Sequence, residues 1–272
     1  MDKEMLKEKL IQAAENQKLE TASIEVLLPL MLPHIGDRDP ILRDRLIYGL
    51  ASEWITKGMV SPKLMNSIMA KLITDEYLHG DEIYTRSFTT LWIAALLYRH
   101  RMEAFLSESA IDEVYQKLLA YIQKETVGKG YDNTYGWVHT LAHAADALDA
   151  LILLTELTND QRQQLVKEII SKMAFPHQTL SHEEDERMAI AIISALKMGI
   201  SPRLIESVLT EKTLEVVACW KTVNEANMHI RANFKQFIRS LYFCTVDYPD
   251  LQKTLLECEQ LFSGIYHNKP SS

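Results

Sequence analysis

The sequence has few cysteines, and their spacing excludes the common cysteine-based sites. Only Cys219, Cys244 and Cys258 occur in 272 residues, and no two of them form a CxxC pair. Paired-cysteine metal knuckles are therefore excluded, and three widely spaced cysteines do not make a disulfide framework. We expect reduced, partly buried thiols in a cytoplasmic protein.

Long apolar runs and a strong positive charge are also missing. The segment LWIAALLY (91–98) is among the longest apolar runs, well short of the roughly 18 residues that a membrane span needs. The opening MDKEMLKEKL is charged and lacks the apolar core of a secretory signal. The net charge of −8 disfavours nucleic acid as the main partner, because neutralising phosphates supplies most of that affinity. We expect no membrane association.

The motifs of several large enzyme classes do not occur. The sequence contains no GxGxxG or GxxxxGK[ST] loop for phosphates and no GxSxG elbow for a nucleophilic serine. No serine or cysteine stands beside a local histidine in a recognisable nucleophile motif. Classical kinase, dehydrogenase and serine-hydrolase interpretations therefore have no support.

Strand signals are nearly absent, whereas helix signals are frequent. There is no Asn-Gly or Asp-Gly turn and no sustained alternation of β-branched residues. The pairs at 39–40, 61–62 and 201–202 each place a capping side chain before a proline at the first helical position. The segments 158–161 and 181–184 fit capping boxes. We predict twelve helices, at 2–15, 23–33, 40–57, 62–74, 83–99, 109–125, 134–156, 160–174, 182–198, 202–219, 226–245 and 250–263.

These helices form pairs that recur along the chain. The second helices of five pairs have similar patterns, anchored at Arg43, Arg86, His139, Arg187 and Arg231, which lie 43, 53, 48 and 44 residues apart. A period in the forties with two helices per period is typical of HEAT-type repeats. We therefore predict an all-α, HEAT/armadillo-like solenoid (an α-α superhelix) of about five helix pairs, forming a single domain over residues 1–272. A compact helical bundle or toroid is the alternative.

The segment GWVHTLAHAADALDAL (136–151) is the most chemically suggestive. His139, His143 and Asp146 are spaced four and three residues apart, so a helix would place all three on one face, opposite its main apolar face. Trp137 stands just before them and is expected to form one wall of a site. In a solenoid of this kind the second helices line the concave surface, where such proteins bind their ligands.

This spacing leaves three interpretations open. The trio could be structural, with Asp146 bonded to His143 on a solvated or inter-helix face. It could belong to a binding site for a ligand or a partner. It could also bind a divalent metal such as zinc, because histidines at i and i+4 with a carboxylate form a known ligand set.

A second cluster, HEEDER (182–187), lies one repeat later. Carboxylates in a first helical turn complement the helix dipole, which alone accounts for Glu184 and Asp185. Adjacent second helices would nevertheless bring these acids and Arg187 close to His139 and His143, so that the two clusters could complete one site.

A basic stripe occurs near the end of the chain. Arg231, Lys235 and Arg239 recur every four residues beside an apolar face, and could meet a phosphate or an acidic partner. A solvated helix face is the simpler explanation, and the acidic balance of the chain counts against a nucleic-acid role.

Three blocks of the sequence resemble a bacterial family known as domain of unknown function 2785. They are YTRSFTTLWIAALL (84–97), with its Arg-Ser-Phe at 86–88, GWVHTLAHAADALDAL (136–151), and EDERMAIAI (184–192). The resemblance runs from the GDRDP turn at 36–40 to the end of the predicted helix 182–198. Alanine at position 145 departs from the family pattern in part. The resemblance supports the choice of residues and implies no activity.

Together these observations favour a binding module. Its groove is expected to carry Arg86, Trp137, His139, His143, Asp146, Glu184, Asp185 and Arg187, and to recognise a protein or a small polar ligand. The alternative is a metal-dependent, hydrolase-like enzyme, with His139, His143 and Asp146 as ligands and Glu184 or Asp185 as general base.

Overall fold

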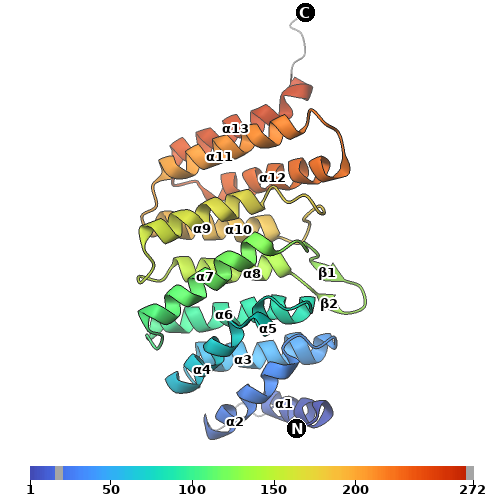
Figure 1. The fold of residues 1–272 in the computed structure, drawn as a ribbon, viewed down its shortest axis with the longest axis vertical. Helices are drawn as coiled ribbons and strands as arrows, with labels where there is room; N and C mark the ends of the chain where they lie inside the picture. Colours follow the sequence, from blue (N-terminus) through green and yellow to red (C-terminus); the bar gives the residue numbers. More distant parts are fainter. Residues whose placement is uncertain (16–20, 268–272) are drawn as a thin grey trace, which may run out of the picture.

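The computed structural model describes residues 1–15 and 21–267, which form an elongated stack of helices (Figure 1). The prediction of an all-helical fold is confirmed, apart from one two-stranded hairpin. The α-helices of the described residues are α1 (Lys3–Glu15), α2 (Thr21–Met31), α3 (Gly49–Thr56), α4 (Pro62–Leu72), α5 (Asp75–Leu78), α6 (Ile83–Met102), α7 (Glu108–Lys124), α8 (Thr140–Ile152), α9 (Asn159–Lys172), α10 (Glu184–Lys197), α11 (Pro202–Cys219), α12 (Glu225–Cys244) and α13 (Pro249–His267). A 3₁₀ turn, η1 (Leu32–His34), follows α2, and a π-helical segment, η2 (Ile41–Tyr48), leads directly into α3.

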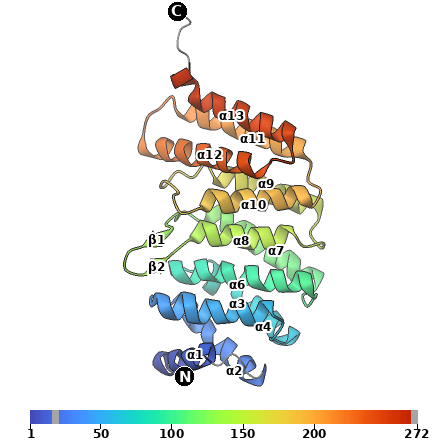
Figure 2. The same cartoon turned by 180° about the vertical axis from the view of Figure 1, so that it is seen from behind.

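The helices pack in two layers. In the first, α3, α6, α8, α10 and α12 contact one another in that order, and Figure 2 shows them side by side. We call these five helices, with η2, the second-helix layer. In the other layer α7, α9, α11 and α13 contact one another in the same way. Each successive pair of helices, which we call a unit, therefore adds one helix to each layer.

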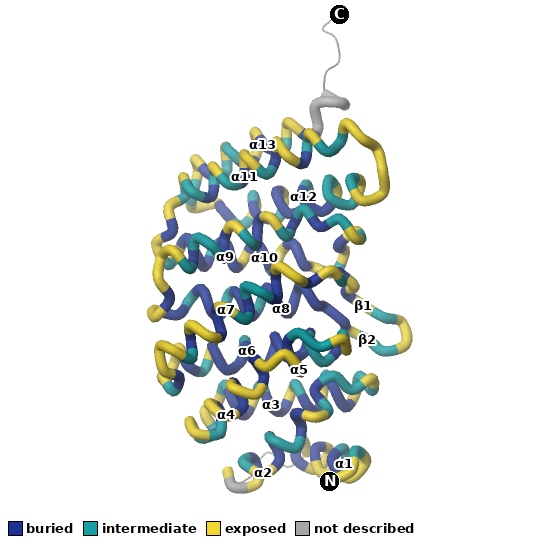
Figure 3. The backbone as a smooth tube through the Cα atoms, in the orientation of Figure 1, coloured by how far each residue is buried: buried dark blue, intermediate teal, exposed yellow. Residues whose placement is uncertain are grey.

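Burial on two sides of the second-helix layer explains its composition. Helix α6 buries Phe88, Trp92, Ile93 and Leu96 on different sides, because α3 and α8 pack against it within its own layer and α4 and α5 pack against it from outside that layer. One cluster of buried apolar side chains runs from Leu6 to Phe262. In Figure 3 the residues coloured as buried run along every level of the molecule from α3 to α12, and the exposed residues lie on the outer sides of the helices and in the loops.

Helix starts follow the predicted capping residues in part. Ser61 caps α4 before Pro62, and Thr158 with Gln161 forms a complete capping box at α9. The capping box predicted for Ser181 and Glu184 is wrong. Glu183 is the N-cap residue of α10, without a side-chain cap, and Glu184 instead accepts a hydrogen bond from the backbone N–H of His182.

The predicted helix 134–156 begins six residues too early. Its first part belongs to an antiparallel hairpin, β1 (Tyr131–Asp132) and β2 (Gly136–Trp137), and α8 begins only at Thr140. Gly136 has a φ of +78°, a conformation that glycine adopts without a steric penalty. The Asp132 carboxylate accepts hydrogen bonds from the N–H groups of Thr134 and Tyr135 and closes the turn. The hairpin projects from the N-terminal end of α8 (Figure 1).

Among the described residues, no helix is both long enough and apolar enough to span a bilayer.

Candidate functional site

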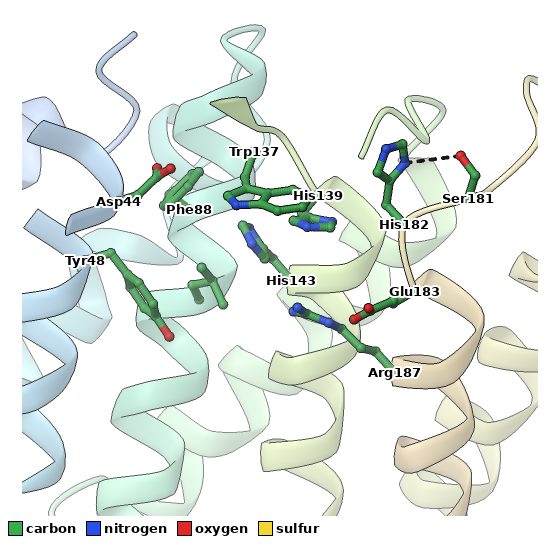
Figure 4. Close-up of a pocket in the computed structure, with 11 residues that line it drawn as sticks. Asp44, Tyr48, Phe88, Trp137, His139, His143, Ser181, His182, Glu183 and Arg187 are labelled. Atoms are coloured by element: carbon green, nitrogen blue, oxygen red, sulfur yellow. Dashed lines mark hydrogen bonds between the residues drawn. The ribbon is translucent and has the colours of Figure 1, made fainter. Parts of the chain in front are cut away.

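A pocket of about 480 Å³ opens where the N-terminal ends of several helices of the second-helix layer lie side by side. Four successive units contribute to it: η2, α6, the hairpin with α8, and the loop before α10 with the first turn of that helix. Figure 4 shows side chains from all four facing the same space. The pocket is lined by Asp44, Tyr48, Phe88, Leu91, Trp137, His139, His143, Ser181, His182, Glu183 and Arg187.

Arg43 holds the hairpin over the pocket. Its side chain is fully buried and donates to the backbone carbonyls of Tyr135 (2.8 Å) and Trp137 (3.2 Å), while Nε donates to the Asp44 carboxylate at 2.7 Å. The guanidinium also lies over the ring of Phe88, 4.7 Å from its centroid. This arginine therefore fixes Trp137 and Asp44, two residues that line the pocket, relative to α6.

His139 joins the hairpin to α8 in a strained conformation. Its φ of 50° lies in the left-handed region, which is unfavourable for residues that carry a Cβ. The ring stacks on Trp137, with centroids 4.4 Å apart and planes 14° from parallel. Burial lowers the pKa of His139 to about 4, and the positive charge of Arg187 adds to this, so the ring is neutral at pH 7. Its Nδ1 is buried and has no hydrogen-bond partner among the described residues.

His143 lies one turn into α8, and residues of α6 hold its ring in place. Its Nδ1 is 2.9 Å from the hydroxyl of Ser87 on α6, and that hydroxyl also bonds to the carbonyl of Val138. The edge-on ring of Phe88 packs 5.0 Å away, centroid to centroid. Burial holds the pKa of His143 well below its usual value of 6.5. The imidazole is therefore neutral and has a fixed orientation.

Asp146 and Arg187 connect α8 to α10. Arg187 Nη1 donates to Asp146 Oδ2 at 2.8 Å, and both side chains are one third exposed. Burial raises the pKa of Asp146 to about 6, and the attraction of Arg187 limits that rise. The pair places the guanidinium at the pocket, with donors left over for another group, because Asp146 is its only hydrogen-bond partner in the described part of the chain.

Glu183 is the second strained residue of the pocket. In the described part of the chain only His139 and Glu183 combine a side chain with a positive φ, 67° in the case of Glu183. Both residues immediately precede a helix of the second-helix layer, and both line the same pocket. Strain of this kind persists where the surrounding structure maintains it, and functional sites are the commonest places.

The strain at Glu183 predicts that glycine is better there for stability. Glu183→Gly is expected to raise the free energy of unfolding by about 1 kcal/mol, because glycine adopts a positive φ freely and the exposed side chain of Glu183 makes no hydrogen bond with described residues. Glu186→Gly, at an exposed position inside the first turn of α10, should lower it by about 0.5–1 kcal/mol. Urea denaturation of both variants checks this, and equal losses would contradict the assignment of strain.

The structure brings together half of the predicted groove residues. Trp137, His139, His143 and Arg187 line the pocket, and Asp146 supports it from behind through Arg187. The hydrogen bond between His143 and Asp146 that the structural interpretation of the trio included does not form, because Asp146 accepts from Arg187 and the His143 Nδ1 is bonded to Ser87.

Arg86, Glu184 and Asp185 are placed elsewhere, which corrects the prediction that they share this groove. Arg86 forms a two-pronged ion pair with Glu125 and lines a separate pocket of about 290 Å³ between α6 and α7. Asp185 points to α12, where it accepts from Gln236 (3.1 Å) and Ser240 (2.5 Å). Glu184 is buried behind the loop before α10.

The predicted metal ligands are not arranged as a set. Within the described ranges, no group of three or more histidine, cysteine or acidic side chains is placed so that it could hold a metal ion. His139 is the N-cap residue of α8 and has a left-handed backbone, so its side chain does not leave the chain in the direction of a helical residue four positions before His143. The carboxylate of Asp146 is paired with Arg187.

The basic stripe on α12 packs against α13. Arg231 bonds to the carbonyl of Phe262 and lies over the ring of Trp220, 4.8 Å from its centroid. Lys235 and Arg239 pair with Glu259 at 3.7 and 2.7 Å. These contacts account for the stripe as part of the packing between the last two helices.

Several pocket residues could not be recognised from the sequence. Asp44 and Tyr48 lie about 90 residues before the histidines, and only the stacking of η2 beside α6 brings them close. His182 and Glu183 belong to the HEEDER segment, but the left-handed turn at Glu183 directs these two, and not Glu184 and Asp185, to the pocket.

The family described as "Protein of unknown function (DUF2785)" matches residues 72–243. The match covers more than half of the chain, from the last residue of α4 to nearly the end of α12, and so includes both histidines, the hairpin and Arg187. It confirms the resemblance seen in the sequence blocks. No curated protein and no solved structure matches the chain.

Proposed function

We propose that this chain, which belongs to the DUF2785 family of proteins of unknown function, is a binding protein that holds a small polar ligand in the pocket of the second-helix layer. The observation that carries the proposal is the convergence of four successive units on one pocket, with both strained non-glycine residues of the described chain in its wall.

The size and lining of the pocket support a small molecule over a protein segment. About 480 Å³ lies within the range of ligand sites, which combine apolar walls with a few convergent polar groups. Here Tyr48, Phe88 and Trp137 supply aromatic surface, and the two imidazoles and Arg187 supply the polar contacts. His143 and Arg187 are held by hydrogen bonds to Ser87 and Asp146 on neighbouring helices, and the aromatic rings and His139 are held by contacts with one another. Little side-chain entropy therefore remains to be lost on binding.

We also propose that the helix pairs form a single HEAT-like solenoid and that the second-helix layer is its binding surface. Support comes from the equivalent positions that the pocket residues occupy. Asp44, His143 and Arg187 are each the fourth residue of η2, α8 and α10. Helix α6 departs from this pattern, because its fourth residue, Arg86, lines the other pocket and Phe88, the sixth, lines this one. A repeated unit places equivalent residues of successive helices side by side.

The proposal is tested by a binding screen against three classes of small molecule: neutral polyols, carboxylates with phosphates, and amines. Saturation-transfer NMR on the full chain is expected to detect one class, with binding weakened roughly tenfold or more in Trp137→Ala and Arg187→Ala. Arg239→Ala, on the α12–α13 face, is the control and should bind normally. If no class binds, or if both pocket variants bind like the control, the proposal is wrong.

A further inference from the structure

The two histidines of the pocket differ in which ring nitrogen carries the hydrogen, and this difference follows from their contacts. The Ser87 hydroxyl has one hydrogen, and the Val138 carbonyl can only accept, so Ser87 donates to Val138. Ser87 must then accept from His143 at the 2.9 Å contact. His143 therefore carries its hydrogen on Nδ1 and keeps a lone pair on Nε2.

That lone pair is available to a ligand. No described group bonds to His143 Nε2, and the atom is not among the fully buried polar atoms that lack a partner. Since the ring lines the pocket, Nε2 is a hydrogen-bond acceptor in contact with the pocket space.

His139 has the opposite arrangement. Its Nδ1 is buried without a partner. This nitrogen carries either a hydrogen or a lone pair, and the lone pair is better tolerated, because buried donors without acceptors are rarer than buried acceptors without donors. The hydrogen then resides on Nε2, which is not fully buried. His139 thus supplies a donor and His143 an acceptor, on two rings whose centroids are 5.2 Å apart.

We infer that this donor–acceptor pair selects a neutral hydroxyl group, and that the ligand of the pocket is a cyclic polyol of monosaccharide size. The inference rests on the proposed function and names its ligand class. One hydroxyl oxygen can accept from His139 and donate to His143 at the same time. A carboxylate has no hydrogen for His143, and an ammonium group has no lone pair for His139. Inorganic phosphate keeps a P–OH hydrogen at pH 7, so it is disfavoured by its negative charge and not by a missing donor.

The charges and the walls of the pocket agree with a neutral ligand. The one cationic side chain in the lining, Arg187, already shares its charge with Asp146, and the carboxylates of Asp44 and Glu183 also line the pocket. An anion would meet no free positive charge. The rings of Tyr48, Phe88 and Trp137 supply apolar surface for the C–H face of a sugar ring, and the carboxylates and Arg187 supply further acceptors and donors for its other hydroxyls.

The tautomers are tested without any ligand. Long-range ¹H–¹⁵N NMR of the full chain at pH 7 distinguishes a protonated from a bare imidazole nitrogen. His143 is expected to show hydrogen on Nδ1 and His139 on Nε2, and Ser87→Ala should abolish the fixed preference at His143. The same tautomer at both residues, or a doubly protonated ring, would overturn the inference.

The ligand class is tested with D-glucose, D-ribose and myo-inositol as neutral polyols, inorganic phosphate and acetate as anions, and methylamine as a cation. Titration calorimetry is expected to detect a polyol, with affinity reduced roughly tenfold in His143→Ala and in His139→Ala. His177→Ala, exposed and outside the pocket, should bind as the unmodified chain does. If a histidine variant does not fold, the unmodified chain is used in its place. The polyol is then expected to shift the ring NMR signals of His139 and His143.

The outcomes separate the two proposals. Binding of phosphate, acetate or methylamine in the pocket without any polyol would overturn the hydroxyl inference and leave the binding function standing. Binding of no probe of any class would overturn both.

Discussion

Replacing Arg43 with methionine is expected to lower the free energy of unfolding by about 3–5 kcal/mol, the usual range when one partner of a buried charged network is removed. The guanidinium is fully buried and donates to the carbonyls of Asp37, Tyr135 and Trp137 and to Asp44. Methionine fills similar space and leaves all four acceptors without that donor. Urea denaturation measures the loss.

The matched control is Arg45→Met, two residues along η2, where the arginine is exposed and its side chain makes no hydrogen bond with the described residues. Its effect should stay within about 0.5 kcal/mol. Hydrogen exchange adds a local readout, since the amides of the hairpin should lose protection in Arg43→Met before those of α8. An Arg43 variant as stable as the Arg45 variant would show that the hairpin is held by other contacts.

Acid is expected to destabilise the protein through His139 and His143. Both have a pKa in the folded chain below the unfolded value of 6.5, about 4 for His139. As the pH falls below 6.5 the unfolded chain takes up protons that the folded chain does not bind, so the stability present above pH 6.5 is progressively lost. For His139 alone the loss between pH 7 and pH 4.5 is about 2 kcal/mol.

The measurement compares the unmodified chain with His139→Gln over this pH range. The advantage of the unmodified chain should shrink by that amount as the pH falls, because glutamine does not titrate. A difference that stays constant with pH would contradict the buried, neutral state assigned to His139.

Asp146 provides a control of opposite sign. Its pKa is raised to about 6 in the folded chain, so the folded chain takes up this proton first and gains stability as the pH falls from 6 towards 4. Relative to Asp146→Asn, the unmodified chain should gain about 1 kcal/mol between pH 7 and pH 4.5, a value reduced for the partial exposure of the carboxylate. The two slopes oppose each other, so neither can be read from the unmodified chain alone.

The pocket residues show which parts of the site can be predicted from local sequence pattern and which cannot. Trp137, His139 and His143 were found because they are close together in the chain, and Arg187 because the helix pairs repeat at a similar spacing. Glu184 and Asp185 do not reach the pocket, because α10 does not begin as a regular capped helix. A left-handed residue at Glu183 turns the first-turn carboxylates away and brings Glu183 and His182 to the pocket.

The same limit applies to His139. A continuous helix from 134 would place both histidines and Asp146 on one face, as for a metal site. The hairpin replaces the first turn and a half of that helix, since Arg43, about 90 residues earlier, satisfies carbonyls that a helix would otherwise bond internally.

The amino-acid sequence by itself determined the helical class, most helix limits and the recurrence of paired helices, because these depend on apolar periodicity and capping within a few residues. Only the tertiary structure decided which polar groups meet. Asp44, Ser87, His143 and Arg187 lie in four different units, and their partners follow from how those units pack. Hydrogen bonds between distant segments leave no trace in local spacing.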